Sequence, residues 1–242
     1  AAVQIAEAAL LANDQAGTVI TGSASNVTDA TSVTRGGGNF TFTDNDADGG
    51  SFFYATTPAD TARVTVNRAQ AGETQLDGTS ANDILVGRDD ADDTIIGKTG
   101  SDYMYGLGGN DIFNLANGHF GAGELIDGGA GTDGIVLTNA TTVNFATGTI
   151  VGVETLTGSG SSDTVTMSAQ QWAAFSTINL AAGGSDVLTV NVSGAVNISA
   201  AAITTVSNTE TGNLTGSGGA DTITLTGDQL NAFLIGSGTI NL

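Results

Sequence analysis

The chain has 242 residues, of which 40% are apolar but only 5% aromatic, with 36 glycines, one proline and no cysteine. The missing cysteines exclude a disulfide framework, a thiolate metal site and a cysteine nucleophile. The 25 acidic residues outnumber the 5 basic ones, and the net charge of −20 disfavours binding to nucleic acid or anionic lipid and favours binding of cations. Short β-branched runs between glycine turns predict an all-β fold.

The sequence predicts neither a membrane-spanning segment nor a secretory signal peptide. No apolar run approaches the ~20 residues that a transmembrane helix needs. The opening "AAVQIAEAALLAND" places no basic residue before its apolar stretch. We therefore expect no membrane insertion and no nucleic-acid partner.

Residues 1–73 carry alternating runs typical of antiparallel strands. The runs are "NFTFT" (39–43), "SFFYATT" (51–57) and "ARVTVN" (62–67), with polar turns such as "DNDADGG" between them. This alternation predicts a small antiparallel β-sandwich-like segment. Together with "AALLAND" (8–14), the segment resembles the cadherin-like tandem repeats of large bacterial surface proteins.

From residue 74 to 137 a glycine-rich unit of nine residues recurs, and each turn ends in an aspartate. Aligned on the aspartate, the copies are "GTSANDILV" (78–86), "DDADDTII" (89–96), "GKTGSDYMY" (97–105), "GLGGNDIFN" (106–114) and "GGAGTDGIV" (128–136), followed by the degenerate "GSGSSDTVT" (158–166), "AAGGSDVLT" (181–189) and "GSGGADTIT" (216–224). The residue two positions after each aspartate is apolar: Leu85, Ile95, Met104, Phe113, Ile135, Val165, Leu188 and Ile223. The pattern predicts a tight turn followed by a short strand that points this apolar residue into a core.

Two such units would make one coil of about 18 residues, so we expect Asp83 to stack on Asp102 and Asp93 on Asp111. Stacked rungs lie ~4.8 Å apart. Two carboxylates at that spacing repel by roughly 1 kcal/mol in water and by a few kcal/mol at a lower effective dielectric. A calcium ion between the rungs would reverse this repulsion, because calcium accepts oxygens from carboxylates and from backbone carbonyls.

These nonapeptides resemble the hemolysin-type, or RTX, calcium-binding repeats, whose pattern is G-G-x-G-x-D-x-U-x. The resemblance implies a right-handed parallel β-roll, a type I exporter, an extracellular cell-surface location and folding in extracellular calcium. By position it makes the carboxylates of Asp83, Asp93, Asp102, Asp111 and Asp133 calcium ligands, together with the backbone oxygens of Gly97, Thr99, Gly100, Gly106, Gly108 and Gly109.

The chain departs from the RTX pattern at several loops. Thr79 and Ala81 stand where glycine is expected, the loop 87–93 carries an insertion, and 22 residues separate Asp111 from Asp133. We therefore expect roughly two or three well-formed calcium sites. For the degenerate copies, with Asp163, Asp186 and Asp221, a turn-capping role and a ligand role both stay open.

Residues 138–242 show a longer period. The stretches "LTGSGSSDTVTMSAQQWAAF" (156–175) and "LTGSGGADTITLTGDQLNAF" (214–233) match at 11 of 20 positions, which predicts degenerate β-solenoid repeats. Each copy contains a predicted helical turn. In the first copy Ser168 caps the turn and Trp172 and Phe175 share one face; in the second copy Thr226 is the cap and Leu230 and Phe233 share the face. Because Leu230 replaces Trp172 in the second copy, we expect Trp172 to belong to the core and not to a sugar-stacking surface.

The sequence predicts a non-enzymatic calcium-binding structural module of a secreted bacterial surface protein or adhesin. The only histidine, His119, lies in a glycine-rich loop, so a Ser-His-Asp arrangement is not expected. Two alternatives stay open: a self-assembling S-layer or extracellular fibre subunit with homotypic contacts, and an accessory domain of a secreted hydrolase.

Overall fold

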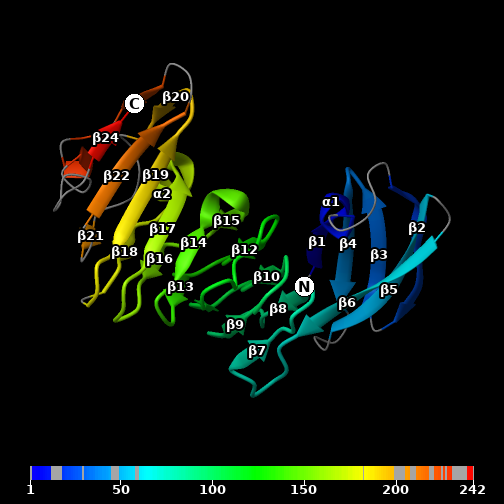
Figure 1. Ribbon diagram of the computed structural model, residues 1–242. Coiled ribbons are helices and arrows are strands. Elements are labelled where there is room, and N and C mark those ends of the chain that lie inside the picture. The colour runs from blue at the N-terminus through cyan, green and yellow to red at the C-terminus, as the bar shows by residue number, and fades with distance from the viewer. Residues whose placement is uncertain are drawn as a thin grey trace.

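The computed structural model describes residues 2–11, 18–28, 30–44, 49–57, 60–181, 183–198, 205–207, 211–217, 221–224, 226, 228–230 and 239–241. The chain is nearly all β, with a small antiparallel part followed by a parallel β-solenoid of about 7 turns (Figure 1). The predicted all-β fold class is confirmed.

The antiparallel part consists of two layers of strands that precede the solenoid. One layer contains β1 (Ala2–Ala6), β4 (Asn39–Asp44) and β3 (Ala30–Gly36), and the other contains β2 (Val19–Thr28), β5 (Gly49–Thr57) and β6 (Asp60–Arg68). The short helix α1 (Glu7–Leu10) follows β1. Alternation in β4 buries Phe40 and Phe42 fully, and the Phe40 ring lies 5.0 Å from that of Phe52 in the opposite layer.

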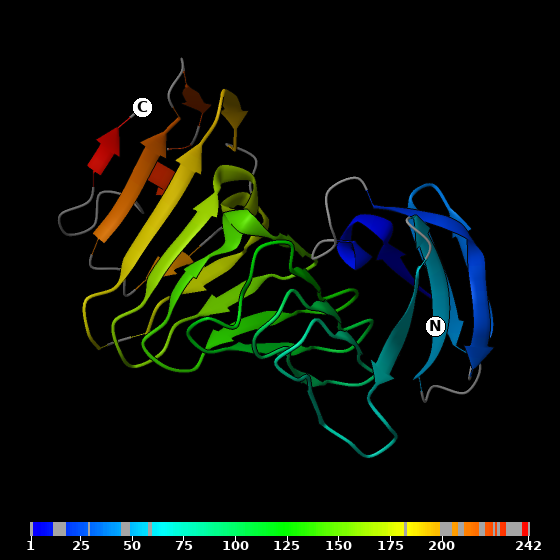
Figure 2. The ribbon, with the colours of Figure 1, turned by 45° about the vertical axis from the view of Figure 1, so that its right-hand side comes forward.

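The antiparallel part and the solenoid share one sheet. Strand β6 pairs in parallel with the first strand of a solenoid face, so that Val66 lies opposite Ile84. Ile84 and Tyr105 pack into the core of the antiparallel part, and the Tyr105 hydroxyl donates a hydrogen bond to the Gln4 carbonyl at 2.6 Å. The two parts are therefore fused through continuous pairing. Figure 2 shows both parts in a view turned by 45° from that of Figure 1.

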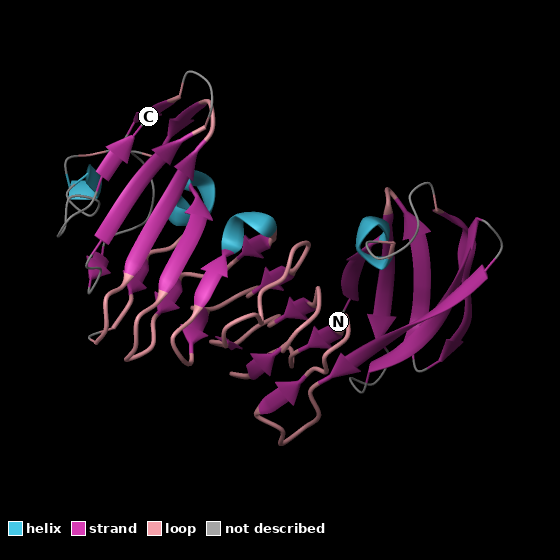
Figure 3. Ribbon diagram, viewed as in Figure 1, coloured by secondary structure: helices cyan, strands magenta, loops and turns pink. Residues whose placement is uncertain are grey.

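The solenoid has three main faces of parallel strands (Figure 3). The first contains β8 (Ile84–Val86), β10 (Tyr103–Tyr105), β12 (Leu125–Asp127) and β15 (Thr149–Val151). The second contains β7 (Gln75–Asp77), β9 (Thr94–Ile96), β11 (Ile112–Leu115), β13 (Gly134–Leu137), β16 (Thr155–Thr157), β18 (Thr177–Asn179) and β21 (Thr205–Ser207). The third contains β14 (Thr142–Asn144), β17 (Thr164–Ser168), β19 (Val187–Val192), β22 (Thr211–Gly216) and β24 (Thr239–Asn241), and β20 (Ala195–Asn197) pairs with β23 (Thr222–Thr224).

The coils lengthen along the solenoid. Stacked residues are 18 positions apart at Asp93 and Asp111, 23 apart at Asp163 and Asp186, and 27 apart at Gly194 and Asp221. The first coils have two strands each, and the later ones add the third face. The apolar residue after each aspartate enters the core as predicted: seven of these side chains have no exposed surface, and Ile223 is partly buried.

Short helical segments lie between strands of the later coils. Ser168 caps α2 (Ala169–Ala174) through a capping box with Gln171, and the Gln171 amide donates to the carbonyl of Phe145 in the 3-10 turn Phe145–Thr147 at 2.7 Å. Trp172 and Phe175 are completely buried, so the predicted cap and core positions are confirmed. Phe233 of the second copy lies outside the described residues. No helix in the described ranges is both long enough and apolar enough to cross a membrane.

The two long repeat copies do not occupy equivalent faces. Leu156 of the first copy lies in β16 on the second face, whereas its counterpart Leu214 lies in β22 on the third. The repeating unit is therefore one turn with its following strand, and the number of such units per coil changes along the chain.

Candidate metal centre

Aspartates at the turns form ladders that run along the solenoid. The backbone N–H of Asp83 donates to Asp102 Oδ1 at 2.9 Å, that of Asp93 donates to Asp111 Oδ1 at 2.8 Å, and that of Asp111 donates to Asp133 Oδ1 at 2.7 Å. The predicted stacking of Asp83 on Asp102 and of Asp93 on Asp111 is confirmed. One carboxylate oxygen in each rung thus satisfies a buried amide of the preceding rung.

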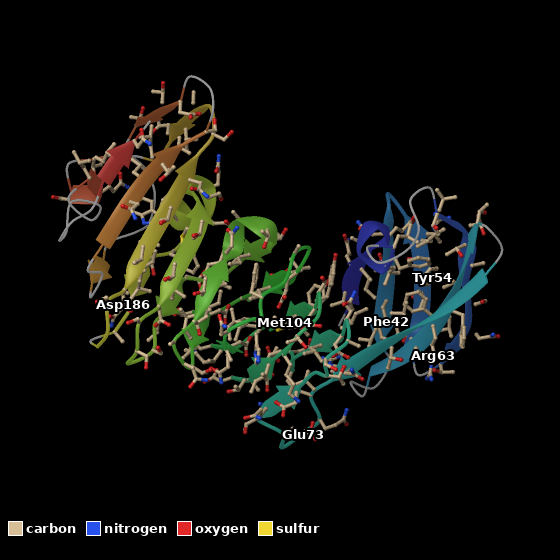
Figure 4. All side chains as sticks on the ribbon, in the orientation of Figure 1. Phe42, Tyr54, Arg63, Glu73, Met104 and Asp186 are labelled. Carbon is tan, nitrogen blue, oxygen red and sulfur yellow. The ribbon has the colours of Figure 1, made fainter. Side chains whose placement is uncertain are left out.

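A further ladder follows the third face. Asp163 Oδ1 accepts the Thr141 N–H at 2.8 Å, and Asp186 Oδ1 accepts the Asp163 N–H at 2.7 Å. Figure 4 shows Asp186 at the turn end of this face, whereas Met104 lies within the coils. The same bond precedes the separate pair of β20 and β23, where Asp221 Oδ1 accepts the Gly194 N–H at 2.7 Å. The inter-rung bond is therefore common to good and degenerate repeats, and it does not distinguish a metal site.

The second carboxylate oxygen does distinguish the turns. At Asp102, Asp111 and Asp133 the Oδ2 atom is buried and has no hydrogen-bond partner. The first glycine of each loop faces this atom, and a Cβ added at Gly97 would lie 2.5 Å from Asp102 Oδ2. Each loop therefore presents a buried carboxylate oxygen beside a position that admits no side chain, which is unfavourable unless a ligand binds there.

The backbone of these three loops is turned away from the carboxylate. The residue four positions before each aspartate has a positive φ: 71° at Lys98, 76° at Leu107 and 92° at Gly129. This conformation is strained for lysine and leucine. The Gly129 N–H bonds to the Asp127 side chain instead of to Asp133. The positive φ therefore occurs in the loops whose aspartate Oδ2 accepts no hydrogen bond from the residue four positions before it.

Other turns satisfy the second oxygen internally. Thr79 donates both its N–H and its hydroxyl to Asp83 Oδ2, at 2.6 and 2.8 Å, and Ser159 does the same for Asp163 Oδ2, at 2.7 and 3.0 Å. Neither residue has a positive φ. Ser217 donates its hydroxyl to the Asp221 carboxylate in the same way. The contacts of Asp163 and Asp221 are those of turn caps.

Asp93 has a cationic partner within its own loop. The Arg88 Nε donates to Asp93 Oδ1 at 2.8 Å, and the Arg88 backbone N–H donates to Asp93 Oδ2 at 2.6 Å. Among the five aspartates predicted as ligands, Asp83 and Asp93 therefore have internal donors on Oδ2, and Asp102, Asp111 and Asp133 do not.

The unpartnered carboxylates are electrostatically unfavourable. Burial raises the pKa of Asp102 and of Asp111 to about 6, and the neighbouring acids add to this effect. Burial also raises the pKa of Asp133, with contributions from nearby carboxylates. A bound cation would oppose both causes, because it favours the ionised form.

Two glutamates take aspartate positions that the sequence interpretation missed. Glu124 is the rung neighbour of Asp102, since the Leu125 N–H donates to the Asp102 carbonyl at 2.9 Å. Its Oε2 accepts the Gly121 N–H, its Oε1 is buried without a partner, and burial raises its pKa to about 8. Glu154 Oε2 accepts the Asp133 N–H at 2.8 Å. Both glutamates precede a fully buried apolar residue by two positions, as the aspartates do, and that spacing was the available signal.

The predicted carbonyl ligands belong to glycine loops that stack on one another. An added Cβ at Gly78 would lie 2.5 Å from the Gly97 carbonyl oxygen, and one at Gly87 would lie 2.7 Å from that of Gly106. The carbonyls of Gly100 and Gly109 face Gly121 and Gly131 in the same way. The Gly108 carbonyl already accepts the Ala91 N–H at 3.0 Å, and Thr99 is exposed.

This donor set fits a hard cation. Carboxylate and carbonyl oxygens are the ligands that calcium prefers, and the Oδ2 atoms of Asp102, Asp111 and Asp133 are buried without a hydrogen-bond partner. Within the described ranges no three His, Cys, Asp or Glu side chains lie close enough to form a metal site by themselves, so carbonyls would have to complete the coordination. Comparisons of the chain with protein-family models, with curated proteins and with solved structures found no match.

Proposed function

We propose that this chain is a non-enzymatic, calcium-binding structural module of a secreted bacterial surface protein, and that its first coils are RTX-like repeats. The observation that supports the proposal is the set of buried, unpartnered Oδ2 atoms at Asp102, Asp111 and Asp133. Every other contact of these carboxylates also occurs in turns with internal donors. The missing partner is therefore the feature that a cation would explain.

The contacts support two proposed cation positions. The first lies between the turns of Asp111 and Asp133, where both Oδ2 atoms lack partners. The second lies between the turns of Asp102 and Glu124, which each have one buried unpartnered oxygen and which interact electrostatically. In both, backbone carbonyls of the stacked glycine loops would supply the remaining oxygens. Bound calcium neutralises the buried charges and ties adjacent coils together.

The rest of the proposed role follows from the shared sheet and the charge. Because β6 pairs directly with β8, coils stiffened by calcium would hold the cadherin-like antiparallel part in a fixed orientation. With a net charge of −20, the chain favours an environment rich in divalent cations. Extracellular modules load their sites at millimolar calcium, so a secreted, cell-surface location fits this dependence.

Hydrogen exchange of the whole chain tests the proposal. Amides of residues 97–137 should gain protection from exchange on going from chelator to millimolar calcium. The protection of amides in residues 155–168 and 39–57 should change much less. Magnesium should substitute poorly, because it requires short octahedral contacts and loses its water reluctantly. Equal protection of all three segments with and without calcium would contradict the proposal.

Self-assembly is a second candidate, favoured by exposed apolar residues on edge strands. Val151 in β15 is 51% exposed and Ile240 in β24 is 44% exposed, and each strand is the last of its sheet within the part of the chain that the structure describes. Unpaired edges with apolar side chains favour pairing between copies. Sedimentation at micromolar concentration with calcium should show ordered oligomers. A single monomeric species would leave the chain as a calcium-stiffened spacer.

A further inference from the structure

The Asp93 turn contains a guanidinium on Oδ1, and the Arg88 backbone N–H donates to Oδ2, the oxygen that has no partner at Asp111 and Asp133. The Arg88 Nη2 atom lies 2.6 Å from Asp93 Oδ1, and the same group donates to the Asp92 carbonyl at 3.0 Å. The Asp93 side chain is 1% exposed and that of Arg88 is 23% exposed. The contact is thus a largely desolvated ion pair, and it includes one carboxylate and one backbone carbonyl.

The next rungs of the same ladder have no such group. Asp93 donates its N–H to Asp111, and Asp111 donates its N–H to Asp133, so the three carboxylates stand in equivalent positions. Both oxygens of Asp93 have partners, whereas the Oδ2 atoms of Asp111 and Asp133 are buried without one. The extra residue in the loop 87–93 lies in this turn, and Leu107 and Gly129 cannot supply a cation in the other two.

We infer that Arg88 is the built-in cation of the Asp93 turn, so that this rung folds without metal and becomes a calcium site only when the guanidinium is removed. The statement that the turn becomes a calcium site without the guanidinium rests on the proposed function. The statement that the rung folds without metal does not. An arginine suits this role because its charge persists at every physiological pH and its planar donors match a carboxylate and a carbonyl together.

The position of this rung gives the inference a structural consequence. Arg68, at the end of β6, forms an ion pair with Asp89 at 3.0 Å, and the Ala69 N–H donates to the Val86 carbonyl. These contacts connect the antiparallel part to the coil that contains Arg88. The first coil is therefore held by the chain's own cations, and it offers a formed edge on which the metal-dependent coils can stack.

The first measurement is hydrogen exchange of the whole chain in chelator. We expect the Asp93 amide and its neighbours in β9 to be protected in the wild type, and Arg88→Met to speed their exchange by about tenfold to a hundredfold, because the buried carboxylate loses the guanidinium on Oδ1 and keeps the backbone N–H on Oδ2. Arg63→Met is the matched control, since Arg63 is exposed and, among the described residues, donates to the Ser51 hydroxyl. Arg88→Lys keeps the charge and should restore part of the protection.

The second measurement is calcium stoichiometry by calorimetry. Arg88→Met should bind one more calcium ion than the wild type, and in calcium its β9 amides should again be protected from exchange. Arg63→Met should bind the same number of calcium ions as the wild type. Wild-type protection of residues 88–96 that appears only with calcium would overturn the inference, as would equal exchange in Arg88→Met and wild type in chelator. If the wild type binds no calcium, the proposed function fails, and the chelator measurement still decides whether Arg88 holds this rung.

Discussion

Asp111 and Asp163 have the same depth and the same inter-rung bond, but their turns treat the second carboxylate oxygen in opposite ways. Both residues are fully buried, and the Oδ1 atom of each accepts a backbone N–H of the preceding rung at 2.8 Å. Ser159 donates twice to Asp163 Oδ2, whereas Asp111 Oδ2 has no partner. Two turns with the same inter-rung bond therefore differ in whether the residue four positions before the aspartate supplies donors to Oδ2, as Ser159 does and Leu107 does not.

The largest expected effect comes from replacing Asp111 by asparagine. With calcium, Asp111→Asn should lose a bound ion and destabilise the chain by about 2–4 kcal/mol. In chelator the same change should stabilise it by about 1 kcal/mol, because the amide oxygen can still accept the Asp93 N–H while a buried charge disappears. Urea unfolding with and without calcium measures both values.

Asp163→Asn is the matched control for this reversal of sign. In this variant an amide NH2 group, itself a donor, would face the N–H and the hydroxyl of Ser159, which donate to Asp163 Oδ2 in the wild type. The variant should therefore destabilise the chain by about 1–3 kcal/mol in calcium and in chelator alike. If the two variants respond to calcium in the same way, the distinction between the two kinds of turn is wrong.

The pH dependence of the metal-free chain should be the next largest effect. Asp102 and Asp111 have a folded pKa of about 6, and Glu124 one of about 8, above the ordinary values of 3.8 and 4.5. At a pH between the ordinary and the folded pKa of each group, the folded state binds a proton that the unfolded state does not. The stability of the folded state in chelator should therefore rise as the pH falls from about 8 to about 5.

With calcium the sign should reverse. Calcium requires deprotonated carboxylates, so acidification releases the ion and the stability that it contributes. Thermal unfolding across this pH range, in chelator and in calcium, provides the measurement. Parallel pH profiles under the two conditions would mean that the raised pKa values do not belong to cation ligands.

The strict parts of the repeat were predictable from the sequence. An apolar residue two positions after each acid has only one way to be buried in a short strand, so Phe113 and Ile135 lie in the core as expected. The spacing of 18 and 19 residues likewise determined which aspartates stack. These features depend on local periodicity, which a single sequence displays.

The partners of the carboxylates were not predicted, although part of the signal was present. Thr79 was interpreted only as a missing glycine, whereas its hydroxyl takes the place of a ligand on Asp83. Glu124 was overlooked because the alignment admitted only aspartate, and its longer side chain serves a turn of different length. The pairing of β6 with β8 has no local signature at all, since either strand could have formed an edge.

Removing a hydroxyl donor should have a smaller effect that is independent of calcium. Ser159→Ala deletes one of the two donors to Asp163 Oδ2 inside a buried turn, and it should destabilise the chain by about 1–2 kcal/mol in calcium and in chelator. Ser161→Ala, at an exposed position of the same loop, should stay within about 0.5 kcal/mol of wild type. A marked calcium dependence of the Ser159→Ala effect would show that this turn already holds a cation.

The smallest expected effect is the conversion of one kind of turn into the other at Lys98. Lys98 lies four positions before Asp102, its side chain is 44% exposed, and its φ of 71° is strained. Lys98→Ser places a hydroxyl beside Asp102 Oδ2 and permits the turn to relax to the form found at Ser159, so stability in chelator should rise by about 0.5–1 kcal/mol. Calcium affinity at this turn should fall at the same time. Lys98→Ala removes the same charge and the same contact with Asp77 without supplying a donor, and it should retain the calcium site. Equal calcium titrations of the serine and alanine variants would show that the hydroxyl does not set the metal dependence of the rung.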